Sequence, residues 1–63
     1  MKLLRPKDAA TKVGLSRMHL YRLERAGRFP RRVRLGVASV GWLEHEVDSW
    51  IAERAAERDQ PRE

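Results

Sequence analysis

The amino-acid sequence predicts a small, mainly helical domain with one β-hairpin, in the order helix, helix, strand, strand, helix. Three observations predict this fold class. Two short amphipathic segments are separated only by residues 14–16, two alternating segments enclose a short loop, and apolar residues return at helical spacing from residue 43 onward. A chain of 63 residues forms one domain at most and buries only about 60% of the surface that its unfolded form exposes. So small a core favours a binding module over an enzyme.

The first expected helix spans residues 6–13. Proline suits the first helical position because the N–H that it lacks has no partner there, and Pro6 stands at that point. Ala9, Ala10 and Val13 continue one face at helical spacing. Gly14 follows, and glycine readily adopts the left-handed conformation that ends a helix. This helix is too short to be stable without tertiary packing.

The second expected helix spans about residues 17–26 and follows after a very short turn. Ser16 is a good N-cap for a helix that begins at Arg17, and Gly27 supplies a stop after Ala26. A turn of about three or four residues that contains glycine, between two short helices, is typical of the helix-turn-helix motif. The sequence therefore predicts that motif within its first half.

The segment after the second helix predicts two short strands. Pro30 precedes them, at a point where a missing N–H disrupts no strand pairing. Residues 32–35 and 40–42 alternate, and residues 36–39 form a loop that begins with glycine. The alternation places Val33 and Leu35 toward the core, with Arg32 and Arg34 on the solvent side.

The third expected helix spans about residues 43–57, where apolar residues recur at helical spacing and acids fill the first turns. Residues 1–57 form the single predicted domain, and residues 58–63 form a frayed charged tail. The predicted core combines one apolar face from each element: Val13, Leu15, Leu20, Leu23, Phe29, Val33, Leu35, Val40, Trp42, Val47, Trp50 and Ile51.

Charge is strongly segregated along the chain. Residues 1–34 carry eleven Lys or Arg against two acids, whereas residues 35–63 carry three against seven, for a net charge of +5. Such a concentration of positive charge favours a polyanion as the partner. The absence of cysteine excludes disulfides and thiolate zinc sites, no apolar run is long enough to span a membrane, and His19 and His45 lie in no metal-binding or catalytic motif. We expect a cytoplasmic protein with no membrane partner, cofactor, metal or catalytic residue.

The outward side of the second helix mixes cations with a methionine and a tyrosine. At about 100° per residue, these side chains lie opposite the leucines that pack inward, and no acid stands three or four residues from Arg22. A helix in the DNA major groove needs such a mixture, since arginine binds guanine edges and apolar groups contact thymine methyls. Tyr21 fits a core-edge aromatic equally well. The candidate DNA-binding residues of this helix are Ser16, Arg17, Met18, Tyr21, Arg22 and Arg25.

A second group of cations flanks this helix. Outward arginines on a β-wing beside a helix in the major groove would follow the phosphate backbone. Binding should then weaken steeply with salt, with a log–log slope of about −0.9 per phosphate contact. The candidates for the wing and the flanking backbone are Arg28, Arg31, Arg32, Arg34, Lys7 and Lys12.

Several strings taken together carry a family resemblance: TKVGLSR at 11–17, LYRL at 20–23, AGRFP at 26–30, VRLG at 33–36, VGW at 40–42 and EHEVDSWI at 44–51. The set, over about residues 3–53, resembles the AlpA family of small phage-associated transcriptional regulators, which belong with the MerR-like and excisionase-like winged helix-turn-helix domains. The resemblance implies a bacterial or prophage DNA-binding regulator, associated with the nucleoid, with a MerR-like wing. The wing tip of such proteins often carries a basic residue after its glycine, whereas residues 37–39 are Val-Ala-Ser. The wing role is therefore carried over only to Arg31, Arg32 and Arg34.

Two alternatives to a regulator stay open from the sequence. An excisionase, which bends DNA for an integrase, shares the fold and the charge. A protein-interaction module, such as a small antitoxin or adaptor, is supported by the acidic C-terminal half. Because one such module offers few base contacts, the expected partners are double-stranded DNA and further copies of the chain on adjacent sites, with RNA polymerase or an integrase acting beside them.

Overall fold

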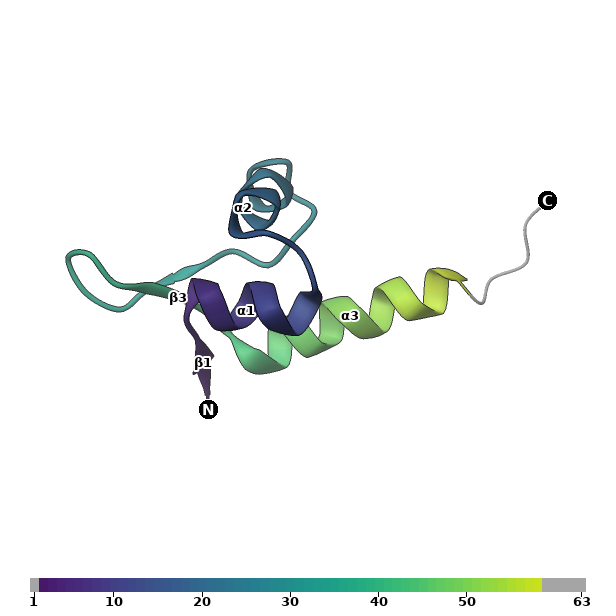
Figure 1. Cartoon of the computed structure of the whole chain (residues 1–63). Helices are drawn as coiled ribbons and strands as arrows, with labels where there is room; N and C mark the ends of the chain where they lie inside the picture. The colour runs from purple at the N-terminus through teal and green to yellow at the C-terminus, as the bar shows by residue number, and fades with distance from the viewer. Residues whose placement is uncertain (1, 59–63) are drawn as a thin grey trace.

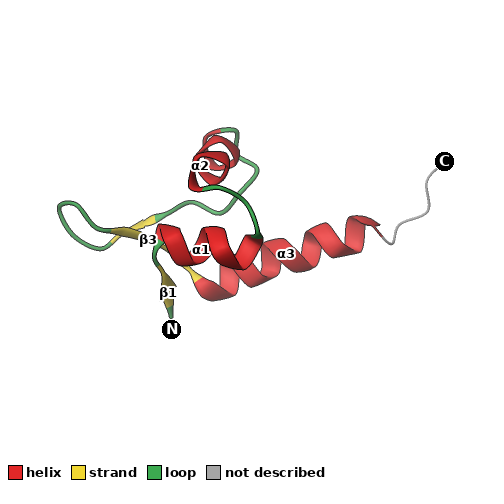
Figure 2. Ribbon diagram, viewed as in Figure 1, coloured by secondary structure: helices red, strands yellow, loops and turns green. Residues whose placement is uncertain are grey.

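The predicted order of elements is confirmed, with one strand added at the start. The computed structural model describes residues 2–58 and contains three helices and a three-stranded antiparallel sheet (Figures 1 and 2). The strands lie in the order β1-β3-β2. The elements are β1 (Leu3–Leu4), α1 (Pro6–Val13), α2 (Arg17–Arg25), β2 (Val33–Arg34), β3 (Val40–Leu43) and α3 (Glu44–Arg58).

Local chemistry sets the ends of α1 and α2 as expected. Pro6 opens α1, and Gly14 closes it with φ 81° and an N–H that donates to the Ala10 carbonyl at 2.8 Å. The Ser16 hydroxyl caps α2 by accepting the His19 N–H at 3.1 Å. The second helix ends at Arg25, one residue before the expected end. The turn between these helices therefore has the length and the caps of a helix-turn-helix.

The third helix begins and ends one residue later than expected. Leu43 belongs to β3, where it pairs with Leu3, so α3 starts at Glu44 and runs to Arg58. The predicted frayed tail lies, from residue 59 on, outside the described residues. Figure 1 shows α1 lying along the first turns of α3, with α2 on the other side of α1 from the N-terminal strand.

The strand β1 was not predicted, and it closes one side of the sheet. Leu3 and Leu4 pair with Leu43 and Trp42, and the Glu44 N–H donates to the Lys2 carbonyl at 2.8 Å. Two residues are too few for an alternating pattern to be visible in the sequence. As a result, β3 is the central strand, hydrogen-bonded on both edges.

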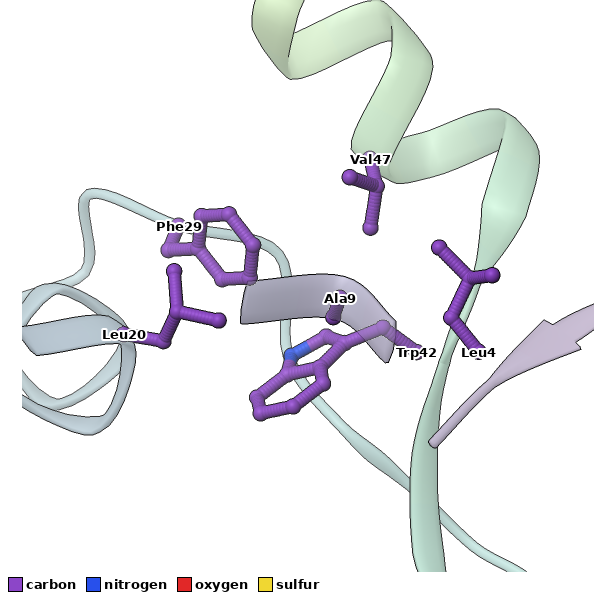
Figure 3. Close-up of a cluster of buried hydrophobic side chains, with 6 residues drawn as sticks. All are labelled: Leu4, Ala9, Leu20, Phe29, Trp42 and Val47. Atoms are coloured by element: carbon purple, nitrogen blue, oxygen red, sulfur yellow. The ribbon is translucent and has the colours of Figure 1, made fainter. Parts of the chain in front are cut away.

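Six side chains form the buried core, shown in Figure 3: Leu4, Ala9, Leu20, Phe29, Trp42 and Val47. Trp42 is fully buried and is its largest member. Its indole Nε1–H donates to the Pro30 carbonyl at 2.8 Å, and its ring meets Phe29 edge-on with 5.6 Å between centroids. The Trp50 ring also meets Phe29 edge-on, with 5.0 Å between centroids, and its Nε1–H donates to the Arg28 carbonyl at 2.7 Å. Both indoles thus satisfy their polar atom on the segment that links α2 to β2.

The predicted core is correct in its centre and wrong at the hairpin. Leu35 is 42% exposed, because the hairpin extends beyond the helices and no element lies beneath its outer end (Figure 1). Leu4 and Ala9 belong to the core but were not in the predicted set. The other predicted core residues are half-buried: Val13, Leu15, Leu23, Val33, Val40, Trp50 and Ile51.

Candidate nucleic-acid interface

The second helix packs on the domain along one side and exposes the other. Leu20 is fully buried and Leu23 is half-buried against the core. Met18, on the opposite side, is 64% exposed, and its cationic neighbours on that side are exposed as well. The exposed residues of this helix are Arg17, Met18, His19, Arg22 and Arg25. The side of α2 that carries Leu20 and Leu23 therefore packs on the domain, and its cationic side is exposed to solvent.

Tyr21 differs from these exposed neighbours. It is half-buried, and its ring centroid is 6.0 Å from that of Trp42. The guanidinium carbon of Arg32 lies over the Tyr21 ring, 5.0 Å from its centroid. Of the two interpretations of this residue, the structure favours the core-edge aromatic. Its ring also provides a surface on which a cation from the wing stacks.

Glu24 joins the end of α2 to the start of the wing, by which we mean residues 31–43, that is β2 with the two residues before it, β3 and the loop between the strands. Its carboxylate accepts the Arg32 backbone N–H at 2.7 Å and pairs with the Arg32 guanidinium at 3.0 Å. The Glu24 side chain is only 9% exposed. Glu24 was not among the predicted site residues. It is the one acid within residues 9–43, so its position among many cations could have indicated an ion pair. The charge of Arg32 is thus largely compensated within the domain.

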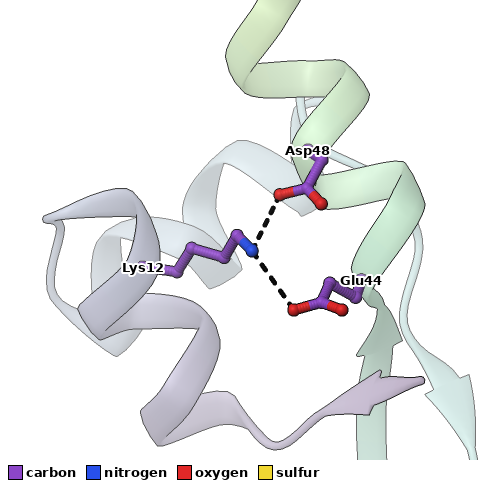
Figure 4. A network of polar contacts seen from close by, with 3 residues as sticks. All are labelled: Lys12, Glu44 and Asp48. Carbon is purple, nitrogen blue, oxygen red and sulfur yellow. Dashed lines mark hydrogen bonds and ion pairs between the residues drawn. The ribbon is translucent and has the colours of Figure 1, made fainter.

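Lys12 is also committed to an internal network, which Figure 4 shows. Its Nζ lies 2.8 Å from an Asp48 carboxylate oxygen and 3.2 Å from one of Glu44. The hydrogen bonds that the Lys12 ammonium donates to Asp48 and, second, to Glu44 raise the pKa of Lys12 above its ordinary value. The network ties α1 to the first turns of α3. This cation was a candidate for phosphate contact, and the structure instead gives it two carboxylate partners.

Most of the other candidate cations carry uncompensated charge. Within residues 2–58, seven exposed candidates form no ion pair with any described acid: Lys7, Arg17, Arg22, Arg25, Arg28, Arg31 and Arg34. The six arginines lie on α2 and on the segment that runs from it into the wing. Ser16, the remaining candidate, is exposed and uses its hydroxyl oxygen as the N-cap acceptor.

Two hollows flank the segment between α2 and the wing. One, of about 570 Å³, separates the end of α2 from the start of the wing and is lined by Tyr21, Glu24, Arg25, Gly27, Arg31 and Arg32. The other, of about 520 Å³, lies against α3 and is lined by Gly27, Arg28, Phe29, Pro30, Glu46, Trp50, Glu53, Arg54 and Glu57. The first is mainly basic, whereas the second combines an apolar floor with several acids.

Two other kinds of site are absent from the described part of the chain. No helix there has the length and the apolar character needed to cross a membrane. No group of three His, Cys, Asp or Glu side chains within residues 2–58 is placed to hold a metal ion.

Comparison with known proteins places this architecture in a family. The family model for the prophage CP4-57 regulatory protein (AlpA) matches residues 2–55. The chain belongs to the AlpA family. That match includes every described element apart from the last residues of α3. The predicted resemblance is confirmed.

Two relatives of this AlpA-family chain are informative. It is 44% identical over 57 residues to the uncharacterized protein ORF88 of Enterobacteria phage P4, which covers 90% of this chain and 65% of that protein. It is 54% identical over 26 residues to the DNA-binding transcriptional activator AlpA of Escherichia coli (strain K12), covering 41% of this chain and 37% of that protein. The chain thus spans less than two thirds of the length of either relative.

Proposed function

We propose that this AlpA-family protein binds double-stranded DNA sequence-specifically and regulates transcription. One observation carries the proposal: six exposed arginines that form no ion pair with an acid of residues 2–58 are gathered on α2 and on the segment that follows it. Exposed like charges repel one another, so this group favours a bound polyanion. The activator AlpA of Escherichia coli, a relative by family and by identity, supports DNA as that polyanion.

The second helix is the element that we assign to the major groove. A major groove about 12 Å wide admits an α-helix, and α2 contacts the domain through Leu20, Tyr21, Leu23 and Glu24, which leaves its other side exposed. Arg22 is the strongest candidate for a base contact because it is exposed and unpaired on the outward face. Met18 can contact a thymine methyl, and Arg17 at the helix N-terminus can reach a base or a phosphate.

The remaining unpaired cations are assigned to phosphates on either side of that groove. Arg28, Arg31 and Arg34 lie on the path into the wing, and Lys7 lies on α1. Lys12 and Arg32 take no direct part because their charges are compensated by acids of the domain. One module of this size offers few base contacts, so useful specificity requires further copies on adjacent half-sites. A regulator bound in this way acts by contacting or excluding RNA polymerase.

Selection of bound duplexes from a random pool tests the proposal. A short enriched motif, tandem or inverted, is expected, and Arg22→Ala should lose discrimination between that motif and scrambled DNA by about 1–3 kcal/mol. Arg54→Ala is the matched control, since it removes an arginine that already pairs with Glu57 on α3. Binding without any enriched motif, or equal losses for the two variants, would rule out sequence-specific recognition by α2.

A second candidate function, that of an excisionase, is favoured by the wing tip. Val37 is 103% exposed and Leu35 is 42% exposed, at the outermost part of the hairpin. Apolar side chains that enter the minor groove can kink DNA by about 20–90°, which is what recombination with an integrase requires. Energy transfer between dyes on the two ends of the selected duplex measures the bend. A bend that Val37→Asp abolishes favours the excisionase, and an unbent duplex excludes it.

A further inference from the structure

The basic hollow between α2 and the wing is lined by three arginines and one acid, Arg25, Arg31, Arg32 and Glu24. We propose that it seats the sugar–phosphate strand that separates the major groove from the adjacent minor groove, with Arg25 and Arg31 contacting consecutive phosphates. Arg32 and Glu24 form the neutral floor of this seat and touch no phosphate. The inference rests on the proposed function. It separates Arg25 from the other candidates of the second helix and Arg31 from Arg32 among the candidates of the wing.

The position of the hollow follows from the two docking elements. If α2 lies in a major groove and the wing reaches the neighbouring minor groove, one phosphate strand must cross the gap between them. That gap is the hollow, because its lining comes from the last turn of α2 on one side and from residues 31 and 32 on the other. A strand crossing there meets Arg25 first and Arg31 next.

The charges of the lining fit a phosphate strand. Arg25 and Arg31 are exposed and form no ion pair with any acid in residues 2–58. Glu24 would repel a phosphate if its charge were free, but it pairs with the Arg32 guanidinium at 3.0 Å and accepts the Arg32 N–H at 2.7 Å. The stacking of Arg32 on Tyr21, at 5.0 Å, holds that pair against the domain. Two uncompensated cations therefore remain at the rim.

The backbone between the two cations is anchored to the domain at several points. Gly27 turns the backbone with φ 76°, and the Arg28 N–H donates to the Leu23 carbonyl at 2.8 Å. The Arg28 and Pro30 carbonyls then accept the indole N–H groups of Trp50 and Trp42, at 2.7 and 2.8 Å. Phe29 lies buried between these anchors. The backbone of the seat is thus preorganised, so little backbone entropy is lost when DNA binds.

This arrangement divides the cations by what they recognise. Phosphate contacts carry no sequence information, whereas base contacts do. Arg25 and Arg31 should contribute equally on every duplex, and Arg22 should contribute mainly on the preferred one. Arg32 is a positioning residue, which acts by holding the wing on α2.

Salt dependence on a duplex of arbitrary sequence tests the seat. Arg25→Gln and Arg31→Gln should each make the log–log slope of affinity against salt shallower by about 0.9, equally for preferred and scrambled duplexes. Arg54→Gln, on α3, should leave the slope unchanged. Glu24→Gln keeps an amide oxygen that can accept the Arg32 N–H but frees the cation, so the slope should steepen by up to about 0.9. Circular dichroism of each variant establishes that it is folded.

Neutral phosphate analogues on the selected duplex then locate the strand. Single methylphosphonate substitutions should weaken the wild-type protein at two consecutive phosphates beside the α2 site. Arg25→Gln should become insensitive to one of them and Arg31→Gln to the other. The proposed seat is refuted if both variants show the same salt dependence of affinity as the wild type. It is also refuted if methylphosphonates at the same two phosphates weaken the binding of both variants as they weaken that of the wild type. A wild-type protein that binds no duplex would instead refute the proposed function.

Discussion

Replacing Gly41 with alanine places a methyl group 2.8 Å from the backbone carbonyl oxygen of Leu4, closer than ordinary van der Waals contact. Gly41 lies in β3, buried between the two edge strands, and pairs with Val33 of β2. The atom that the methyl group meets belongs to the backbone of β1, so a side-chain rotation cannot relieve the overlap. Either β1 moves away from β3, or β3 itself shifts within the core.

The cost follows from what β1 contributes. Leu4 is 7% exposed and packs in the core, and full burial of a leucine side chain stabilises a protein by roughly 1.5–3 kcal/mol. Displacement of β1 loses part of that burial together with the pairing of Leu3 and Leu4 to β3. We expect Gly41→Ala to reduce the free energy of unfolding by about 2 kcal/mol. In a domain of this size, that change lowers the melting temperature by roughly 8–16 °C.

Thermal unfolding followed by circular dichroism measures this effect, and Gly36→Ala is its control. Gly36 lies in the wing loop, where an added Cβ meets nothing within 4 Å and the backbone has no left-handed conformation. The control should melt within about 2 °C of the wild type. If the two variants melt at the same temperature, the inference that β1 packs closely against Gly41 is wrong.

Three further predictions concern the internal contacts of the domain. Glu24→Ala leaves the Arg32 N–H and guanidinium without their acceptor and should lower the free energy of unfolding, measured with urea, by about 1–2 kcal/mol. An unchanged free energy of unfolding would mean that the Glu24–Arg32 contact does not form in solution. Trp50→Phe keeps a ring but loses the N–H donor to the Arg28 carbonyl and should cost about 1 kcal/mol, by the same assay, and wild-type stability would contradict the bond. Lys12 has a folded-state pKa above its ordinary 10.5, so its contribution is fully present below that pH and is lost as pH rises through the folded pKa. The stability difference between the wild type and Lys12→Met should therefore shrink at strongly alkaline pH, and a difference that grows there would refute the network.

Local chemistry explains which parts of the fold were predictable. Pro6, Gly14 and Ser16 act within one or two turns of the chain, so the limits of α1 and the start of α2 followed from residue types alone. Alternation placed Leu35 on the inward face of its strand, yet it carries no information on where the core beneath that face ends. The two-residue strand β1 has no periodicity to detect and exists because β3 offers it a free edge.

The sequence predicted which cations of the candidate site are exposed, but it could not predict which of them form ion pairs. Helical geometry correctly placed Arg22 and Arg25 on the exposed side of α2. Whether a cation is free or compensated depends on acids brought close by folding. Lys12 meets Glu44, 32 positions away in the chain. The availability of each arginine and lysine could therefore be judged only with the tertiary structure.

The short strands of the sheet limit how neighbouring copies of the chain can pair with one another. Exposed strand edges serve as templates on which other chains can pair and aggregate. Here each edge of β3 is paired over two of its four residues, and the two outer strands are only two residues long each. Neither outer edge is long enough to support a further strand. If copies bind neighbouring sites as proposed, we therefore expect them to remain separate folding units and not to join into a continuous sheet.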